Sequence, residues 1–395
     1  MVLFRRNRGG DENGDSDAAP KKEKGSWRRP ANTAFKQQRL KAWQPILTPK
    51  TVLPTLFIIG IIFAPIGGLL IWGSGLVSEM TFDYTQCENQ TPSPSSSNLV
   101  LHNLTNYKYR LRSSDTNAPY NPPQFAFLDR SGNTSVPQAE WKQCFIQFDV
   151  PIPLEPTVLL YYKLTNYYQN HRRYVNSYDS NQLKGQYVSP STLNGGDCKP
   201  LAVQGDKVIY PCGLIANSLY NDTYSGLTST TNPTVTYNFS EQGIAWPGEA
   251  KKYASTPGYN LSQIIPPPNW NATYPNGYTE NSPPPNLKTN EHFQNWMRTA
   301  GLPTFTKLYG RNDNATLRKD RYQITVNLNY PVLPYSGTKS IVISTVSWIG
   351  GKNPFLGWAY VASAALLVFL AILGTIRHML RPRKLGDMSL LSWNR

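Results

Sequence analysis

The sequence predicts a two-helix membrane protein whose large middle segment is a mainly-β domain with antiparallel strands, long ordered loops and a short helix. Three observations lead to this prediction. Two long runs near the ends of the 395-residue chain contain no charged residue. Basic residues are in excess at the two ends of the chain, before the first run and after the second. Several stretches between the two runs alternate apolar with polar residues. A chain with 39% hydrophobic and 12% aromatic residues also has enough apolar material to build a core, which excludes a fully disordered protein.

The two uncharged runs are Thr51 to Ser78, with 28 residues, and Asn353 to Ile376, with 24. At about 1.5 Å per residue, a helix over either run is longer than the ~30 Å of hydrocarbon in a bilayer. The first run is not a cleaved signal peptide, since 50 residues precede it. We therefore predict transmembrane helices over residues 51–78 and 353–376.

Charge divides the chain into three parts. Residues 1–50 hold 12 basic and 5 acidic residues, residues 377–395 hold 5 and 1, and residues 79–352 hold 22 and 18. By the positive-inside rule, the arm 1–50 and the tail 377–395 are cytosolic and the domain 79–352 is lumenal or extracellular. A nearly neutral lumenal domain is a poor nucleic-acid binder. Residues 1–27 are polar and charge-rich, which predicts disorder.

Acceptor sequences for N-linked glycans agree with this orientation. Asn-x-Ser/Thr sequences occur only between the two runs. Their asparagines are Asn89, Asn103, Asn133, Asn221, Asn238, Asn260, Asn271 and Asn314. We expect glycans on this domain.

The four cysteines, Cys87, Cys144, Cys198 and Cys212, lie in the same domain. In an oxidising compartment an even number of cysteines predicts disulfides, and four allow three pairings. Chain order favours Cys87 with Cys144 and Cys198 with Cys212. A zinc site is the rival interpretation, but the sequence has no Cys-x-x-Cys pair and its histidines show no ligand spacing.

Alternation with period two predicts the strands of the middle domain. It occurs over Cys144 to Val150, Tyr322 to Tyr330 and Ile341 to Thr345, and Thr157 to Leu164 has the composition of a more buried strand. One helix is predicted over Asn290 to Ala300. Asn290 can cap it, and Gly301 with Pro303 ends it.

No motif for catalysis is present. The sequence contains neither a phosphate-binding loop, nor a Gly-x-Ser-x-Gly nucleophile turn, nor a His-Glu-x-x-His zinc motif. The uncharged runs also carry no ionisable group of the kind that pumps need within the membrane. We therefore expect a protein that is not an enzyme, takes no cofactor or metal, and does not transport a solute alone.

Two segments are candidates for partner binding. In Lys163 to Tyr178, Arg172 and Arg173 stand among Tyr167, Tyr168 and Tyr174, and Tyr with Arg is typical of interface hot spots. The alternative is a solvated turn whose tyrosines fill the core. In Asn32 to Pro49, Trp43 and Arg39 belong to a candidate interfacial helix, for which ordinary positive-inside flanking sequence is the alternative.

Several strings resemble one known family. They are RRPANTAFKQQRLKAWQP from Arg28, YYKLTNYYQNHRRYVNSYD from Tyr161, YPCGLIANSLYNDT from Tyr210, PPPNW from Pro266, FQNWMRTAGLPTF from Phe293, and GTKSIVIS followed by IGGKN. With the two-helix topology, they resemble fungal-type members of the cell division control protein 50 / ligand-effect modulator family. These proteins are accessory β-subunits of phospholipid-flipping P-type ATPases.

The resemblance implies a β-sandwich with insertions and a disulfide between Cys198 and Cys212. It also implies a non-catalytic subunit that binds a large ATPase, and that is needed for folding of the ATPase, its exit from the endoplasmic reticulum and its activity. Such a protein lies in membranes of the secretory pathway. Two other classes remain open: a lectin-like or adhesion receptor that acts without an ATPase, and a trimeric two-helix channel.

Overall fold

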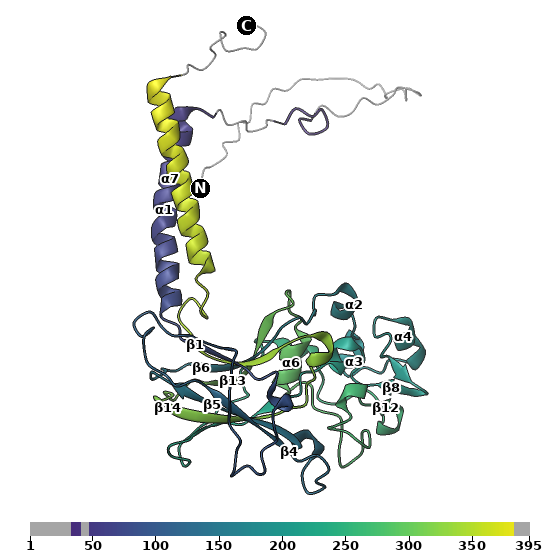
Figure 1. Ribbon diagram of the computed structural model, residues 1–395. Coiled ribbons are helices and arrows are strands. Elements are labelled where there is room, and N and C mark those ends of the chain that lie inside the picture. The colour runs from purple at the N-terminus through teal and green to yellow at the C-terminus, as the bar shows by residue number, and fades with distance from the viewer. Residues whose placement is uncertain (1–32, 41–46, 383–395) are drawn as a thin grey trace, which may run out of the picture. The chain divides into compact units, whose positions relative to one another are not determined.

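The computed structural model describes residues 33–40 and 47–382. Residues 55–373 form one compact unit, and the described residues 33–40, 47–54 and 374–382 belong to a second. Two long helices, α1 (Pro49–Gly75) and α7 (Phe355–Leu380), flank a mainly-β segment in the sequence (Figure 1). This confirms the predicted two-helix protein with a mainly-β domain.

Helices α1 and α7 are long and apolar enough to cross a membrane. Their large side chains, such as Ile61, Leu69 and Phe369, are largely exposed. The core helix of a soluble protein would bury such side chains, so lipid is their suitable solvent. Helix α1 ends at Gly75, three residues before the end of the uncharged run, and α7 continues past Ile376 to Leu380.

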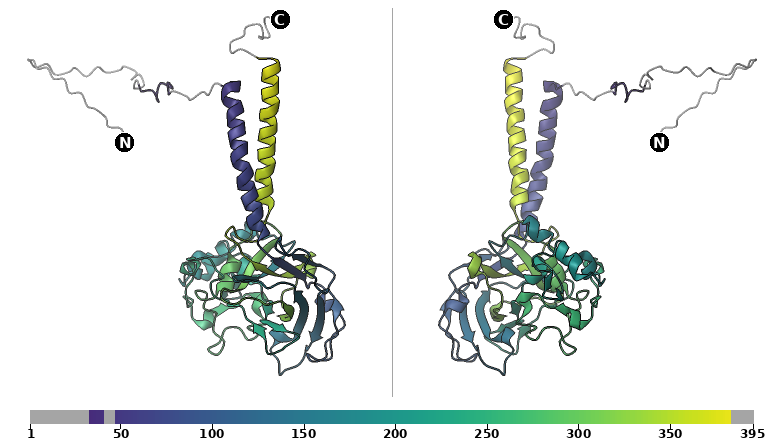
Figure 2. Two further views of the ribbon diagram at one scale, coloured as in Figure 1. Left: turned by 90° about the vertical axis from the view of Figure 1, so that its left-hand side faces the viewer. Right: turned by 90° about the vertical axis from the view of Figure 1, so that its right-hand side faces the viewer.

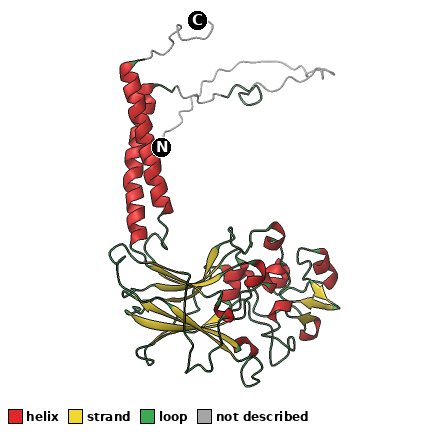
Figure 3. Cartoon of the chain, viewed as in Figure 1, coloured by secondary structure: helices red, strands yellow, loops and turns green. Residues whose placement is uncertain are grey.

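The strands of the domain fall into three sheets (Figure 3). A five-stranded sheet has the order β13 (Phe305–Asn312), β6 (Val158–Leu164), β15 (Lys339–Thr345), β1 (Glu79–Asp83) and β3 (Tyr107–Arg110). A seven-stranded sheet has the order β11 (Thr236–Tyr237), β10 (Leu227–Ser229), β14 (Asp320–Asn327), β5 (Lys142–Val150), β4 (Gln124–Asp129) and β2 (His102–Asn103), with β9 (Thr223–Tyr224) also paired to β14. The small third sheet joins β12 (Ile264–Ile265), β8 (Lys207–Ile209) and β7 (Val203–Gln204).

The two large sheets pack face to face around one apolar core. Their inward side chains form a single buried cluster, in which the rings of Phe82 on β1 and Phe148 on β5 stack 4.5 Å apart. Every pairing within the two sheets is antiparallel, and Ile324 lies opposite Ile146. On β14 the period-two alternation therefore corresponds to one buried and one half-buried face, whereas the first six residues of β15 are all buried.

The predicted strands are β5, β6, β14 and β15, but their ends differ from the prediction. β5, β14 and β15 each begin two residues earlier than predicted, and β6 begins one residue later. The pattern from Tyr322 to Tyr330 predicts a strand of nine residues, but β14 ends at Asn327. The backbone amides of Asn329 and Tyr330 donate instead to the carboxylate of Asp222, at 2.6 Å each. A side chain thus replaces the neighbouring strand as the acceptor.

A long insertion between β6 and β13 builds a second core beside the sandwich (Figure 3). It contains α2 (Arg172–Val175), α3 (Ser180–Leu183), α4 (Pro190–Gly195), α5 (Leu214–Asn217), α6 (Glu291–Met297) and the small sheet. Short 3-10 helices lie in the loops at 87–89, 138–140, 249–252, 261–263, 268–270 and 333–335. In the small sheet, β12 pairs with β8 in parallel, unlike the antiparallel pairing expected throughout the domain.

Each core contains one disulfide. Cys87 is bonded to Cys144, which lies on β5 inside the sandwich. Cys198 is bonded to Cys212 within the second core. This is the pairing that chain order favours.

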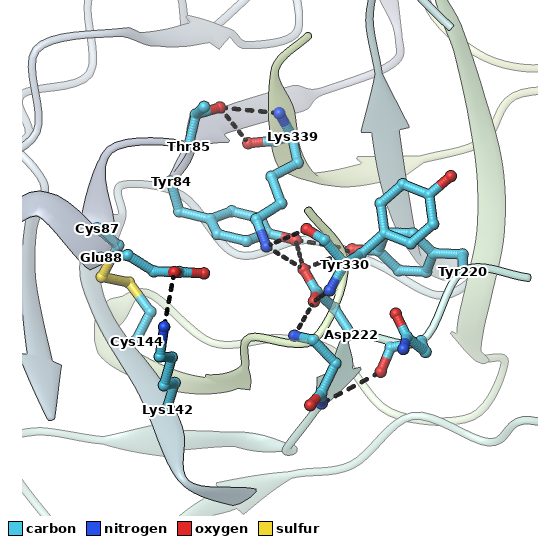
Figure 4. Close-up of polar contacts among 12 residues, drawn as sticks. Tyr84, Thr85, Cys87, Glu88, Lys142, Cys144, Tyr220, Asp222, Tyr330 and Lys339 are labelled. Atoms are coloured by element: carbon cyan, nitrogen blue, oxygen red, sulfur yellow. Dashed lines mark hydrogen bonds and ion pairs between the residues drawn. A yellow bond between two sulfur atoms is a disulfide. The ribbon is translucent and has the colours of Figure 1, made fainter. Parts of the chain in front are cut away.

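A buried ion pair joins the first residue of β15 to the loop before β9 (Figure 4). Lys339 Nζ donates to Asp222 Oδ2 at 2.8 Å, and the two residues are 3% and 1% exposed. Lys339 also donates to the Tyr330 carbonyl at 2.9 Å, and the Tyr84 hydroxyl donates to Asp222 Oδ2 at 2.9 Å. Since the amides of Asn329 and Tyr330 donate to Oδ1, both carboxylate oxygens have donors, which offsets the cost of removing the two charges from water.

Three tyrosines surround this pair. The hydroxyl of Tyr84 forms hydrogen bonds with the hydroxyls of Tyr220, at 2.7 Å, and Tyr224, at 2.9 Å. Burial raises the pKa of all three hydroxyls well above its usual value, and the charge of Asp222 raises it further. All three therefore remain neutral hydroxyls, and those of Tyr84 and Tyr220 lie within hydrogen-bond distance of the buried carboxylate.

The chain enters and leaves the domain on neighbouring strands. β1, which follows α1, pairs with β15, which precedes α7, and Thr345 N donates to the Ser78 carbonyl at 2.9 Å. Lys352 Nζ donates to the carbonyls of Val77 and Leu111 at 2.8 Å each. These bonds hold the adjoining ends of the two long helices together.

Small residues line the contact between α1 and α7. Gly60 and Gly67 on α1 and Gly357, Ala364 and Ala371 on α7 are buried and recur at intervals of seven. A Cβ atom added to Gly67 would lie 2.7 Å from Val361 Cγ2 and 2.9 Å from the Gly357 carbonyl oxygen. The backbones thus approach more closely than larger side chains permit.

Asp222→Asn should lower the free energy of unfolding by about 3–5 kcal/mol, because it leaves the ammonium of Lys339 buried without a charge partner. Lys339→Met should have a similar effect. The double variant should lose less than the sum of the two single losses, since no isolated charge remains. Denaturant unfolding of the full-length protein in detergent measures these values, and strictly additive losses would contradict the coupling.

Gly67→Leu should separate α1 from α7, because the added side chain meets the backbone of Gly357. Gly68→Leu is the matched control, since a Cβ at Gly68 meets no atom within 4 Å. The rings of Phe63 and Tyr360 are 5.0 Å apart across the same contact. Cross-linking of Phe63→Cys to Tyr360→Cys by a short thiol reagent should fail with Gly67→Leu and persist with Gly68→Leu. Equal cross-linking yields in both variants would contradict the close contact between α1 and α7.

A candidate partner-binding surface

The tyrosines of the segment around α2 divide between core and surface. Tyr167 is half-buried, and its ring packs against those of Trp296 and Tyr335 with centroids 5.8 and 5.5 Å away. The hydroxyl of Tyr174 hydrogen-bonds to the hydroxyl of Ser218 at 2.8 Å, and burial raises its pKa far above the usual value. Tyr167 and Tyr174 therefore fill the core, which is the alternative left open for this segment.

Tyr168, Arg172 and Arg173 are exposed on the same segment. The loop before α2 is tied to the loop after α6 by a buried amide, Gln169, whose Oε1 accepts from Ala300 N at 2.9 Å. Asn170 Nδ2 also donates to the Gly301 carbonyl at 3.0 Å. Because these bonds join the two loops, their exposed side chains form one surface.

Helix α6 is shorter than predicted. The sequence predicts a helix to Ala300, but α6 ends at Met297. Lys307 Nζ donates to the carbonyls of Asn295, at 2.7 Å, and Arg298, at 2.5 Å, so a buried ammonium takes up carbonyls at the helix end. The capping of the other end by Asn290 is as expected, since its side chain accepts from Phe293 N at 2.9 Å.

Lys307 has no carboxylate partner among the residues that the structure describes. Burial lowers its pKa to about 7, and the positive charge of Arg298 contributes to the shift. Its Nζ lies 5.7 Å from the ring centres of Trp296 and Phe305. The two carbonyls and the two rings together stabilise its charged form.

A third loop joins this surface through the first turn of α6. The carboxylate of Glu291 accepts from the backbone amides of Gly243, Ile244 and Ala245 at 3.1, 2.7 and 2.9 Å. This fixes the next residue, Trp246, whose ring lies 4.2 Å beneath the guanidinium of Arg298. Trp246 is 62% exposed, and Leu302 is 69% exposed.

We call Tyr168, Arg172, Arg173, Trp246, Arg298 and Leu302 the α2–α6 surface. Trp246, Arg298 and Leu302 are not among the binding residues predicted from the sequence. Their neighbours give a hint, because Trp246 precedes Pro247 and Gly248, and Leu302 stands between Gly301 and Pro303. A large apolar residue among turn-forming residues is seldom needed for a core.

A pocket of about 450 Å³ adjoins this surface. Its charged residues are Lys184, Lys252, Arg298 and Glu249, and Glu249 is paired with Lys252 at 2.8 Å. Figure 1 shows α2 on the side of the domain from which α1 and α7 leave, and Figure 2 shows both long helices leaving the domain at that one side. The surface therefore offers aromatic, aliphatic and cationic groups to a partner that lies at or near the membrane.

The predicted binding residues Arg39 and Trp43 belong to the segment 32–49, of which the structure describes only a part. Residues 34–38 form a turn, with Arg39 N donating to the Ala34 carbonyl at 2.7 Å, so the predicted helix over residues 32–49 is not formed there. Trp43 lies outside the described residues. Within the described part of the chain, no three His, Cys, Asp or Glu residues are grouped to hold a metal ion.

The eight glycan acceptor asparagines lie in the domain between α1 and α7. Seven are exposed, namely Asn89, Asn103, Asn133, Asn238, Asn260, Asn271 and Asn314. Asn221 is half-buried. The exposed seven leave room for an attached glycan.

Comparison with known proteins covers nearly the whole chain. The sequence model of the LEM3 (ligand-effect modulator 3) family / CDC50 family matches residues 70–384. The phospholipid-transporting ATPase accessory subunit CDC50 of Chaetomium thermophilum is 38% identical over 99% of this chain and 97% of its own length. The accessory subunit CRF1 of Saccharomyces cerevisiae is 40% identical over 93% of this chain and 89% of its own, and mouse cell cycle control protein 50A is 38% identical over 94% and 95%. Because the family model matches residues 70–384 and the Chaetomium relative matches 99% of the chain, this chain belongs to the LEM3/CDC50 family.

Proposed function

We propose that this protein is a non-catalytic accessory subunit of a phospholipid-transporting P-type ATPase, needed for the folding, endoplasmic reticulum exit and activity of that ATPase. One observation carries the proposal: relatives named as accessory subunits of such ATPases match 93–99% of this chain. No cofactor is needed for this role, since the ATPase supplies the chemistry.

The protein is a membrane protein of the secretory pathway, with both termini in the cytosol and the β domain in the lumen or outside the cell. The excess of basic residues at both ends and the confinement of glycan acceptor sequences to the domain support this orientation. The domain carries N-linked glycans, and the arm with Arg39 and Trp43 packs on the cytosolic side of the ATPase.

The α2–α6 surface binds lumenal loops of the ATPase. Because α2 lies on the side from which α1 and α7 leave, the surface is on the membrane-facing side of the domain. Its loops are held by buried polar side chains, so little conformational entropy is lost when a partner binds.

Affinity purification of the full-length protein in mild detergent tests the function. A large ATPase should copurify in a one-to-one ratio. A homotrimer would favour a channel, and a monomer delivered normally to its membrane without an ATPase would favour a receptor. Either result would overturn the proposal.

Arg172→Ala combined with Arg173→Ala should weaken binding of the ATPase about thirtyfold or more, because hot-spot side chains contribute ~2 kcal/mol or more. The matched control is Arg318→Ala with Lys319→Ala, which removes two exposed charges from the turn between β13 and β14. Copurification and ATPase activity are the readouts. If both are unchanged in the first variant, the surface is not the interface.

A further inference from the structure

Asn221 differs from the other seven acceptor asparagines in its surroundings. It is half-buried, and its Oδ1 atom is enclosed without a hydrogen-bond partner among the described residues. An enclosed acceptor without a donor costs about 1–3 kcal/mol. The next residue, Asp222, is fixed in the core by Lys339, so Asn221 cannot easily turn away.

Asn221 forms part of the wall of a pocket of about 400 Å³, a size typical of small-molecule sites. The eleven residues of the wall carry no charge. They are Tyr167, Asn217, Ser218, Leu219, Asn221, Asn269, Asn329, Tyr330, Pro331, Pro334 and Tyr335. Without a cationic or anionic group, the pocket suits a neutral ligand rather than a phosphate or a metal ion.

The side-chain amides of Asn217 and Asn329 are held in place in this pocket. Asn217 Oδ1 accepts from Asn269 N at 2.9 Å, and Asn329 Nδ2 donates to the Ala139 carbonyl at 2.9 Å. Each amide retains further hydrogen-bonding capacity for a ligand. Tyrosine rings and proline rings provide apolar faces beside these amides. Fixed amides beside such faces match a sugar ring, which presents both hydroxyls and apolar C–H faces.

We propose that this pocket seats the first sugar of an N-linked glycan on Asn221. Asn221, Asp222 and Thr223 form an acceptor sequence, and a sugar bonded to a residue of the pocket wall is present there at a high effective concentration. In the linking step, Asn221 Nδ2 displaces a lipid diphosphate from C1 of a lipid-linked oligosaccharide and loses one proton. The inference rests on the proposed lumenal location of the domain.

Protection from peptide N-glycosidase tests whether the pocket binds the first sugar, because this enzyme must reach the bond between sugar and asparagine. The full-length protein is treated in mild detergent in heavy-oxygen water, and mass spectrometry follows each site. Release at Asn221 should be at least tenfold slower than at exposed Asn314 or another exposed occupied site, and equal to it after denaturation. Equal release rates in the folded protein would show that the pocket does not hold the glycan of Asn221.

Glycan occupancy distinguishes failure of the pocket proposal from failure of the proposed lumenal location. If exposed sites carry glycans and Asn221 does not, the lumenal location stands and the pocket proposal falls. If no acceptor site carries a glycan, the location falls with it.

A pocket variant separates binding of the sugar from simple crowding. Asn269→Ala removes one amide but keeps the backbone N–H that bonds to Asn217. Release of the Asn221 glycan from the folded protein should become about tenfold faster. The matched control, Asn181→Ala, alters an exposed asparagine of α3 outside the pocket and should leave the rate unchanged. An unchanged rate with Asn269→Ala would mean that the amide does not hold the sugar.

Discussion

The buried pair of Asp222 and Lys339 is the interaction on which the rest of the domain depends. It joins the first residue of β15 to the loop before β9, and the backbone beyond β14 bonds to the same carboxylate. An unpaired charge at this depth would be strongly destabilising, so all these segments must be in place together. The pair therefore couples the closing of the sandwich to the docking of the insertion that lies between β6 and β13.

In the insertion, too, buried polar side chains fix the positions of loops. Glu291 fixes the loop of Trp246, Lys307 holds the carbonyls at the end of α6, and Gln169 joins the loop before α2 to the loop after α6. Each of these polar side chains is partly or fully buried and has its hydrogen bonds satisfied, so it determines the position of a loop that has little apolar core of its own. A rigid surface with exposed Arg, Tyr and Trp results, which suits a subunit that recognises a partner rather than a substrate.

Neighbouring strands explain how the domain and the membrane helices act together. β1 and β15 lie side by side, so α1 and α7 meet the domain at one place, where Lys352 bonds to the segments after α1 and β3. The small-residue contact continues this pairing into the helices. A displacement of the domain would therefore move both helices together. The outer apolar faces of the helices remain available to lipid or to another helix.

The sequence by itself determined the features that depend on local pattern: two long apolar helices, the strands β5, β6, β14 and β15, and the N-cap of α6 at Asn290. These follow from the periodicity and composition of neighbouring residues, which act whatever the rest of the chain does. Only the tertiary structure decided which tyrosines face outward, because Tyr167 and Tyr168 are adjacent in sequence and differ only in what packs against them. It also paired Asp222 with Lys339 across 117 residues, ended α6 early through Lys307, and enclosed Asn221 beside a pocket. Each of these depends on contacts between distant segments, and a charged or amide side chain gives no sign in the sequence of whether folding will bury it.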